Sequence, residues 1–281
     1  MKMVQMPRRH PVSAGFHLAG FRDVDGADDA EAYLAYLDSV GEVFRDVIRF
    51  GIEALRLRAG SAVLDVGCGH GVCLPLLAQQ VGASGRVAGL DASAAMVAAA
   101  RRRMAAQGLA AQVERGDAHA LPFGDAAFDA ARIDRVLMFL RDPQQALAEL
   151  VRVTRPGGRI CVTEGDIGTH GIDATDVVTT RAMLAALSDR SPHGWIGRRL
   201  RAMCVDAGLA EIELSLVPIL STSYAEWNDR LGVESQAALA VDGGLVSAQA
   251  AAAWLDDLRT RDAQGRFTAI ALLFVVTATR P

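Results

Sequence analysis

The sequence predicts an α/β protein with a doubly wound, mostly parallel sheet. Short apolar segments alternate with helical patterns between residues 62 and 163, as expected when buried parallel strands are joined by helices. A glycine-rich turn directly follows the first apolar segment, and an acidic residue, Asp91, ends the second. Ligands of doubly wound sheets bind beyond the carboxyl ends of the strands, so we expect the site at that edge.

The first strand and its glycine turn are the centre of this prediction. Ala62 to Val66 is a short apolar run of the kind that forms a strand buried on both faces. Gly67, Gly69 and Gly71 follow at alternate positions, where the missing Cβ lets a ligand lie against the main chain. The dinucleotide fingerprint needs a glycine where this chain has Val72, so a ligand without a pyrophosphate is favoured.

The second strand and the helix after it predict a nucleoside site. Residues 86–90 read as the strand, and Asp91 follows it with Ala92 beside it. A carboxylate at this position can accept hydrogen bonds from ribose hydroxyls in several classes of adenosine cofactor. Ser93 is a suitable N-cap for the next helix, and Met96 lies one turn into that helix, where it can pack on the adenine.

The third strand, near residues 112–115, leads into a loop that begins Gly116, Asp117, Ala118. His119 follows in the same loop and could contact the ring of a bound nucleoside, although a half-exposed histidine without a role is the simpler interpretation.

The fourth and fifth strands are predicted at residues 128–132 and 159–163. Asp142 and Pro143 are a good N-cap and first residue for the helix between them, at residues 144–154. The sequence Arg-Pro-Gly-Gly at residues 155–158 is expected to end that helix in a turn.

The remaining segments flank this core. Residues 28–57 have a helical pattern that fits either an ordinary covering helix or a lid over the cofactor. Residues 166–205 are expected to be helical, residues 211–219 a strand, residues 224–257 helical with an interruption at Gly243 and Gly244, and residues 267–277 a final apolar strand.

Three motifs in this order resemble the class I S-adenosylmethionine-dependent methyltransferases. They are the Asp-x-Gly-x-Gly-x-Gly turn headed by Asp65, the Gly-Asp-Ala loop at residues 116–118 and the Arg-Pro-Gly-Gly turn. The pattern is closest to the small-molecule methyltransferases related to the ubiquinone and menaquinone enzymes. The resemblance implies S-adenosyl-L-methionine as cofactor. It implies these cofactor-binding residues: Asp65, Gly67, Cys68, Gly69, Asp91, Ala92, Met96, Gly116, Asp117, Ala118 and Arg132.

The resemblance also assigns roles to parts of this set. Asp117 would take the adenine amino group, the Ala118 N–H would meet a ring nitrogen, and the Arg132 carbonyl would meet the methionine part. The implied fold is a Rossmann-like seven-stranded methyltransferase sheet with an antiparallel last strand and helical cap insertions.

The predicted organisation is a single domain over residues 1–281. It would comprise an N-terminal helical lid at 1–58, a cofactor-binding half at 59–165, and the cap insertions and last two strands at 166–281.

The predicted reaction is methyl transfer to an oxygen or carbon of a small, largely apolar acceptor such as a secondary metabolite. Many relatives carry a histidine where this chain has Phe139, so a base must come from elsewhere or be unnecessary. His193 and His170, in the predicted cap, are the catalytic candidates. The alternatives are an enzyme that binds the cofactor without transferring its methyl, such as a cyclase, an NAD-dependent oxidoreductase, and a non-enzymatic binding module.

Composition limits the class of partner. Hydrophobic residues make up 51% of the chain, charged residues 22%, and the formal net charge is −4. These values fit a globular protein with a large core and argue against nucleic acid as the partner. No apolar run has the length of a membrane span or the setting of a signal peptide, so a cytoplasmic protein is expected. The four scattered cysteines suggest neither a metal site nor disulfides, and a homodimer is compatible with the sequence.

Overall fold

A seven-stranded sheet with the order β3-β2-β1-β4-β5-β7-β6 runs through the protein. The computed structural model describes residues 24–26, 33–34, 37 and 44–281. The first five strands are parallel, whereas β7 is antiparallel to both of its neighbours, β5 and β6. The strands are β1 (Ala62–Val66), β2 (Arg86–Asp91), β3 (Gln112–Arg115), β4 (Phe128–Asp134), β5 (Thr154–Ile172), β6 (Ala210–Ser221) and β7 (Ala269–Thr279). The predicted sheet, with its antiparallel last strand, is confirmed.

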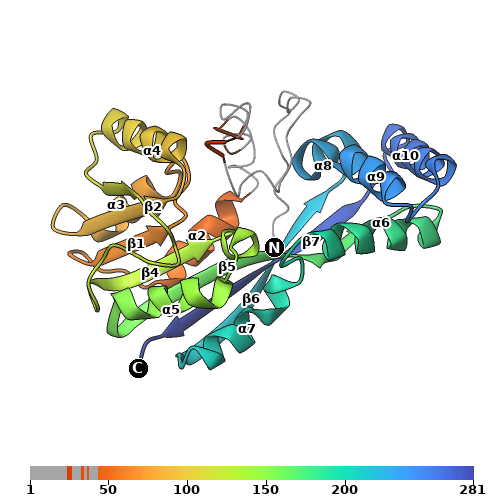
Figure 1. Ribbon diagram of the computed structural model, residues 1–281. Coiled ribbons are helices and arrows are strands. Elements are labelled where there is room, and N and C mark those ends of the chain that lie inside the picture. The colour runs from red at the N-terminus through yellow and green to blue at the C-terminus, as the bar shows by residue number, and fades with distance from the viewer. Residues whose placement is uncertain (1–23, 27–32, 35–36, 38–43) are drawn as a thin grey trace.

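Helices cover both faces of this sheet (Figure 1). One face packs on α5 (Pro143–Val153) and α7 (Ile196–Asp206), and the other on α2 (Arg45–Ala54), α3 (Leu74–Val81) and α4 (Ala94–Ala106). Adjacent strand residues serve opposite faces, since Leu64 belongs to the first core and Val63 to the second.

Two of these helices begin at the caps that the sequence predicts. The Ser93 hydroxyl accepts a hydrogen bond from the Met96 N–H at the start of α4, and the Asp142 carboxylate accepts one from the Gln145 N–H at the start of α5. Each cap satisfies a main-chain donor that has no partner within its helix. Both helices therefore begin at fixed points beside the carboxyl ends of the strands.

The fifth strand is much longer than predicted. It spans 19 residues, includes the Arg-Pro-Gly-Gly segment that was expected to be a separate turn, and continues to Ile172. The expectation of a helical region from residue 166 is therefore wrong at its start, because helix α6 (Val177–Arg190) begins eleven residues later. The physical reason is the partner strand: β7 pairs with β5 as far as Ile172, opposite Ala269.

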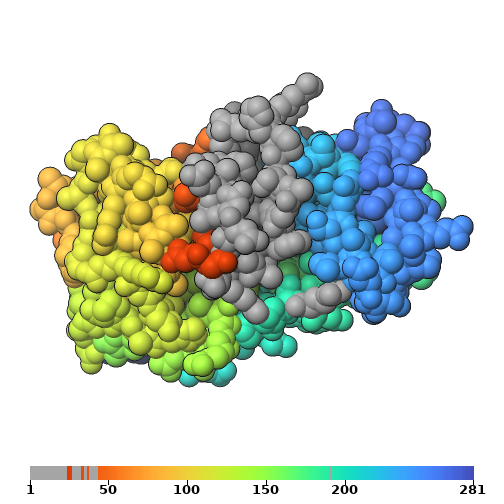
Figure 2. Space-filling view, turned by 45° about the horizontal axis from the view of Figure 1, so that its top comes forward, coloured from red at the N-terminus to blue at the C-terminus, as the bar shows by residue number. Residues whose placement is uncertain are grey.

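The extended ends of β5 and β7 carry a second group of helices. These are α6, α8 (Tyr224–Leu231), α9 (Val233–Asp242) and α10 (Ala248–Ala263), which share a core with Phe267 and Ala269. The Trp254 Nε1 atom donates a 2.8 Å hydrogen bond to the Thr180 hydroxyl inside this core. Figure 2 shows the blue α8, α9 and α10 on the opposite side of the molecule from the yellow α4 region.

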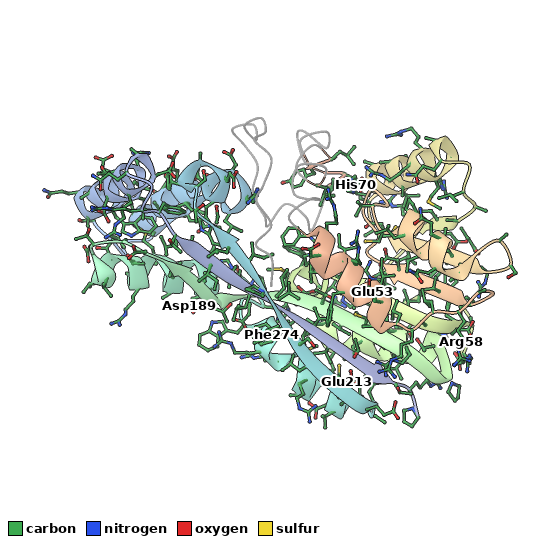
Figure 3. All side chains as sticks on the ribbon, turned by 180° about the vertical axis from the view of Figure 1, so that it is seen from behind. Glu53, Arg58, His70, Asp189, Glu213 and Phe274 are labelled. Carbon is green, nitrogen blue, oxygen red and sulfur yellow. The ribbon has the colours of Figure 1, made fainter. Side chains whose placement is uncertain are left out.

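The predicted N-terminal helix is described only in part. Helix α2 occupies its end and packs Val47, Ile48 and Ile52 against the sheet. Figure 3 shows this helix from behind, with Glu53 labelled. Most of the predicted lid lies outside the described residues. Among the described helices, none has the length and apolar character needed to cross a membrane.

A buried carboxyl group lies where β5 passes the loop after β4. Glu164 is fully buried, and its Oε1 atom accepts a hydrogen bond from the Met138 N–H at 3.3 Å. The Oε2 atom has no hydrogen-bond partner among the described residues. Burial raises the pKa of Glu164 to about 8, and the neighbouring Asp134 carboxylate adds to the rise. Glu164 is therefore largely protonated at neutral pH.

We expect Glu164→Gln to flatten the pH dependence of stability. Because the folded pKa lies above the ordinary value, the carboxyl contributes stability that is full at acid pH and is lost as the pH rises towards about 8. The melting temperature of the variant, relative to wild type, should be higher at about pH 8.5 than at about pH 5. Circular dichroism at both pH values measures this difference. Glu53→Gln, at an exposed site on α2, is the control, and an equal shift at both pH values would contradict the expectation.

Candidate active site

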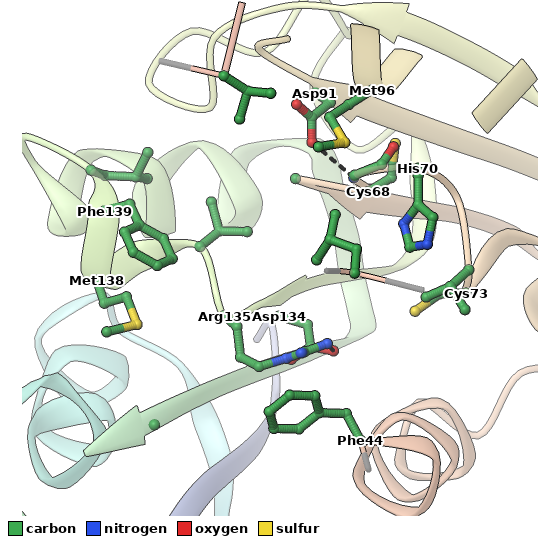
Figure 4. Close-up of a pocket in the computed structure, with 18 of the residues that line it drawn as sticks. Phe44, Cys68, His70, Cys73, Asp91, Met96, Asp134, Arg135, Met138 and Phe139 are labelled. Atoms are coloured by element: carbon green, nitrogen blue, oxygen red, sulfur yellow. Dashed lines mark hydrogen bonds and ion pairs between the residues drawn. The ribbon is translucent and has the colours of Figure 1, made fainter. Parts of the chain in front are cut away.

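A cavity of about 380 Å³ lies at the carboxyl ends of the parallel strands. All eleven residues predicted to bind the cofactor line it, and so does His170. Figure 4 shows Cys68, Asp91 and Met96 on one side of the cavity and Met138 and Phe139 on the other. The structure thus brings together residues that are spread over the chain from Asp65 to His170.

The glycine turn follows β1 in a conformation that requires glycine. Gly67 and Gly71 have φ angles of 69° and 80°, in the left-handed region that other residues avoid. A Cβ on Gly67 would lie 2.2 Å from the Val136 side chain, and one on Gly71 would lie 2.9 Å from the Ala100 main chain. The turn therefore packs closely between α4 and the loop after β4, and only glycine fits at these two positions.

Asp91 connects the glycine turn to the end of β2. Its Oδ2 atom accepts a hydrogen bond from the Gly69 N–H at 2.8 Å, and its Oδ1 atom accepts one from the Ser93 N–H at 3.0 Å. A carboxylate has about four lone-pair sites, so both oxygens can accept further hydrogen bonds from ribose hydroxyls. Burial raises the pKa of Asp91, while the bonds from Ser93 and Gly69 oppose that rise.

An N-terminal residue that sequence reasoning missed is attached at the same place. The Asp25 carboxylate accepts hydrogen bonds from the Ser93 hydroxyl at 2.5 Å and from the Ala94 N–H at 2.7 Å. Val24 and Tyr33 pack with Met96 in a small core. Met96 thus connects the cavity wall to the described N-terminal residues. No local sequence pattern around Asp25 predicts its hydrogen bonds to Ser93 and Ala94.

The loop after β3 supplies the opposite end of the nucleoside site. Gly116 donates its N–H to the Asp91 carbonyl at 2.9 Å, which holds the end of β3 against the end of β2. Asp117 and Ala118 follow directly and line the cavity. The His119 N–H and then its ring lower the pKa of Asp117, so its carboxylate is ionised and accepts hydrogen bonds only.

A chain of buried charges underlies the cavity. The Arg132 side chain is 1% exposed, with its Nη2 atom 2.7 Å from Asp134 Oδ2 and its Nη1 atom 3.7 Å from Asp65 Oδ1. Burial would raise the pKa of Asp134, but Arg135 and Arg132 outweigh it and hold that pKa low. Burial raises the pKa of Asp65 to about 6 against the opposing charge of Arg132. The role predicted for Arg132 was a contact of its carbonyl with the cofactor, which stays a prediction. In the structure its side chain pairs with Asp65 of β1 and Asp134 of β4.

Arg135 extends this chain of charges into the cavity. Its Nε atom lies 2.9 Å from Asp134 Oδ1, and its guanidinium stacks over the Phe44 ring at 4.1 Å from the centroid, as Figure 4 shows. Sequence reasoning did not assign Asp134 and Arg135 to the site. Two adjacent charged residues at the end of a buried apolar strand do indicate a site, because buried charges need partners.

His193, a predicted catalytic residue, and two aromatic residues of the cap lie apart from the cavity. His193 is not among the cavity-lining residues, and its Nε2 atom lies 2.9 Å from the Leu140 carbonyl oxygen. Trp195 is 45% exposed and stacks on Arg198. Tyr224 packs on Phe267 inside the second group of helices. Among the described residues, Phe44, Phe139 and Trp227 are the Phe, Tyr and Trp side chains that line the cavity.

The residues present fit S-adenosylmethionine. Two carboxylates that can accept hydrogen bonds from ribose hydroxyls or an adenine amino group, Asp91 and Asp117, line the cavity. The turn between β1 and α3 offers main chain without Cβ atoms to a ligand in the cavity, at Gly67 and Gly69. Among the described residues, no group of three or more side chains gathers as a metal site. The fold and site together define an α/β enzyme of the methyltransferase type.

Comparison with known proteins gives the family. The methyltransferase domain family matches residues 63–158. An uncharacterized 37.1 kDa protein in transposon Tn4556 of Streptomyces fradiae is 41% identical over 251 residues, covering 87% of this chain and 70% of that protein. The ubiquinone/menaquinone biosynthesis C-methyltransferase UbiE of Hahella chejuensis is 37% identical over 139 residues, which span 48% of this chain and little more than half, 56%, of that enzyme.

The fold has known counterparts as well. The crystal structure of the YcgJ protein of Bacillus subtilis superposes with a TM-score of 0.58 at 19% identity, covering 84% of this chain and 99% of that one. The chain belongs to the class I S-adenosylmethionine-dependent methyltransferases, and S-adenosylmethionine is its cofactor. The family assignment removes the NAD-dependent oxidoreductase and the non-enzymatic binding module as alternatives.

We expect Asp91→Ala to weaken binding of S-adenosylhomocysteine by about 1.5 to 3 kcal/mol, because hydrogen bonds to a charged group have that strength. Titration calorimetry measures the loss, and wild-type protein should show no binding of NAD. Asp189→Ala, at an exposed position on α6, should bind like wild type. Unchanged affinity in Asp91→Ala would remove this carboxylate from the cofactor site.

Proposed function

We propose that this protein transfers the methyl group of S-adenosylmethionine to an oxygen or carbon of a small, largely apolar metabolite, such as a secondary metabolite. The observation that carries the proposal is the composition of the cavity beyond the cofactor residues. Its walls there are apolar and continuous with the cofactor end. They comprise Met138, Phe139, Leu140, Ile167, Leu187, Ile219, Trp227, Leu231 and Leu272.

The acceptor end is built by elements outside the cofactor half. Ile167 comes from the extended part of β5, Leu272 from the paired part of β7, and Trp227 from α8. An apolar wall of this kind favours an acceptor with few charges, because a polar group left without a hydrogen bond there is costly. We infer that quinone-like, phenolic or polyketide-like molecules fit this end.

The chain's own residues can orient the acceptor and exclude water. When bound, S-adenosylmethionine supplies an electrophilic methyl group on a sulfonium. The apolar walls keep water from competing, and a correctly placed acceptor atom gains much of its rate from proximity. The polar side chains at this end are His170, Arg230 and Gln236, and they can orient hydroxyl or carbonyl groups.

His170 is the better placed of the two predicted bases. It lies on β5 against the Trp227 ring, with ring centroids 6.1 Å apart. Burial lowers the pKa of His170 to about 4, so the ring is neutral at physiological pH but is a weaker base than an ordinary histidine. His193 remains a prediction, but its position outside the cavity lining offers no direct path to an acceptor.

Radiolabelled methyl transfer tests the proposed function. The protein would be incubated with methyl-labelled S-adenosylmethionine and two matched panels, one of quinones, phenols and polyketides and one of small polar amines, nucleosides and peptides. We expect label in the apolar panel only, and its loss in Asp91→Ala. Label confined to the polar panel would contradict the proposal. Cofactor binding without transfer to either panel would favour the cyclase-like alternative.

We expect His170→Ala to lower turnover of a hydroxyl acceptor by at least about tenfold, the lower range for loss of a general base. Affinity for S-adenosylhomocysteine should stay at the wild-type value, and His193→Ala should have the smaller effect on turnover. Because the lowered pKa keeps the ring neutral down to about pH 4, the wild-type profile should lack a limb from this residue between about pH 6 and 8. Full activity in both variants would mean that positioning and an intrinsically reactive acceptor suffice.

A further inference from the structure

The loop that carries Asp117 is fastened along helix α5. The Leu121 N–H donates to Glu149 Oε2 at 2.7 Å, and Arg152 donates to the Leu121 carbonyl at 3.0 Å and to the Phe123 carbonyl at 2.8 Å. These contacts fix the later part of the loop. The part next to the cavity depends on another side chain, His119.

Both ring nitrogens of His119 have partners. Its Nε2 atom lies 3.2 Å from the main-chain nitrogen of Asp142, the N-cap residue of α5. Its Nδ1 atom lies 2.6 Å from Asp117 Oδ1. The His119 carbonyl also accepts a 3.3 Å bond from the Gln145 side chain. The histidine therefore spans the gap between the first turn of α5 and the Asp117 carboxylate.

These partners determine where the ring carries its proton. A main-chain N–H can only donate, so His119 Nε2 must accept and carries no hydrogen. A neutral ring then has its hydrogen on Nδ1, where it donates to Asp117 Oδ1. The opposite tautomer would place an N–H against an N–H at α5 and leave the carboxylate facing a bare nitrogen.

These hydrogen bonds give the two carboxylate oxygens of Asp117 different environments. Asp117 Oδ1 accepts from both the ring and the main-chain N–H of His119, at 2.6 Å and 2.9 Å. No described residue donates to Oδ2, and Asp117 lines the cavity. A carboxylate oxygen accepts about two hydrogen bonds, so Oδ1 is filled and Oδ2 is left to accept from a further donor.

We propose that His119 is a positioning residue for cofactor recognition: as the Nδ1-protonated tautomer fixed by the Asp142 N–H, it orients Asp117 so that Oδ2 reads the adenine 6-amino group. The structure gives His119 only an indirect role, because its ring is not part of the cavity wall. Sequence reasoning considered a direct ring contact or no role at all. The proposal concerns the cofactor end and does not depend on the acceptor.

Two ligands that differ at the 6-position of the purine test this role. S-adenosylhomocysteine has a 6-amino donor, whereas S-inosylhomocysteine has a 6-oxo acceptor that a carboxylate repels. The inosyl ligand also carries a hydrogen on N1, so the change in the affinity ratio between wild type and variants is the measure of the His119 contribution. By titration calorimetry, wild type should bind the amino ligand at least about tenfold more tightly, the factor for one hydrogen bond to a charged group. A wild-type ratio near one would overturn the proposal.

Three variants separate positioning from mere support of the fold. His119→Phe keeps a ring of similar size without either nitrogen and should reduce the ratio to less than about threefold. His119→Asn keeps a donor near the Nδ1 position and should restore most of it. His193→Phe also removes a histidine bond to the main chain of the loop before α5, and it should keep the wild-type ratio. A wild-type ratio in His119→Phe would overturn the proposal.

A double variant and a spectroscopic measurement complete the test. His119→Phe combined with Asp117→Asn should discriminate no worse than Asp117→Asn alone, because both changes remove one interaction. Additive losses would overturn the proposal. Nitrogen NMR of the wild-type imidazole rings, with His119 assigned by its absence in His119→Asn, should show the Nδ1-protonated neutral tautomer. An Nε2-protonated His119 ring would overturn the proposal. This measurement is made on the wild-type protein, so it does not depend on whether the variants fold.

Discussion

The buried guanidinium of Arg132 is the constraint on which the site depends. A charge taken out of water costs several kcal/mol unless ions and hydrogen bonds compensate it. Arg132 lies opposite Asp65 in the register of β4 and β1, and Asp134 meets it from two residues along its own strand. The central strands must therefore carry acids at these positions, and removal of either acid would leave a buried positive charge under the glycine turn.

The loop after β4 is positioned at its start by this network of buried charges. It begins next to Asp134 and is then held at three separate points by side chains of other elements. Glu164 accepts the Met138 N–H, the His193 ring meets the Leu140 carbonyl, and the His119 ring accepts the Asp142 N–H. Since Met138, Phe139 and Leu140 line the cavity, these contacts fix the position of this part of the cavity wall.

The cofactor half could be predicted because its signals are local. Strand, glycine turn and helix follow one another within about twenty residues, and the caps at Ser93 and Asp142 act within one helical turn. The length of β5 could not be predicted, since the pairing of Ile172 with Ala269 joins residues nearly a hundred positions apart. The same holds for Asp25, whose partner Ser93 has no pattern that points to it.

The histidines show the same limit at the level of single residues. Composition and position in the cap made His170 and His193 equivalent candidates, whereas in the structure one lies in the cavity wall and the other against the main chain of Leu140. His119 looked incidental because its two partners belong to different elements and only the fold brings them together. The role of each histidine depends on which groups lie near it in the folded protein, and the sequence gives no direct measure of those distances.

Part of the proposed acceptor end rests on a core of its own. The cofactor end depends on residues between Asp65 and Arg135, which are packed mainly into the two cores of the sheet. In the proposed acceptor end, Met138, Leu140 and Leu272 also pack on the sheet. The rest of its wall comes mainly from α6, α8 and α9, whose core is separate and connects to the sheet through the extended ends of β5, β6 and β7. Changes in α8 or α9 can therefore reshape the acceptor wall without disturbing the Arg132 network. This separation is a physical reason why one cofactor half can serve methyltransferases with different acceptors.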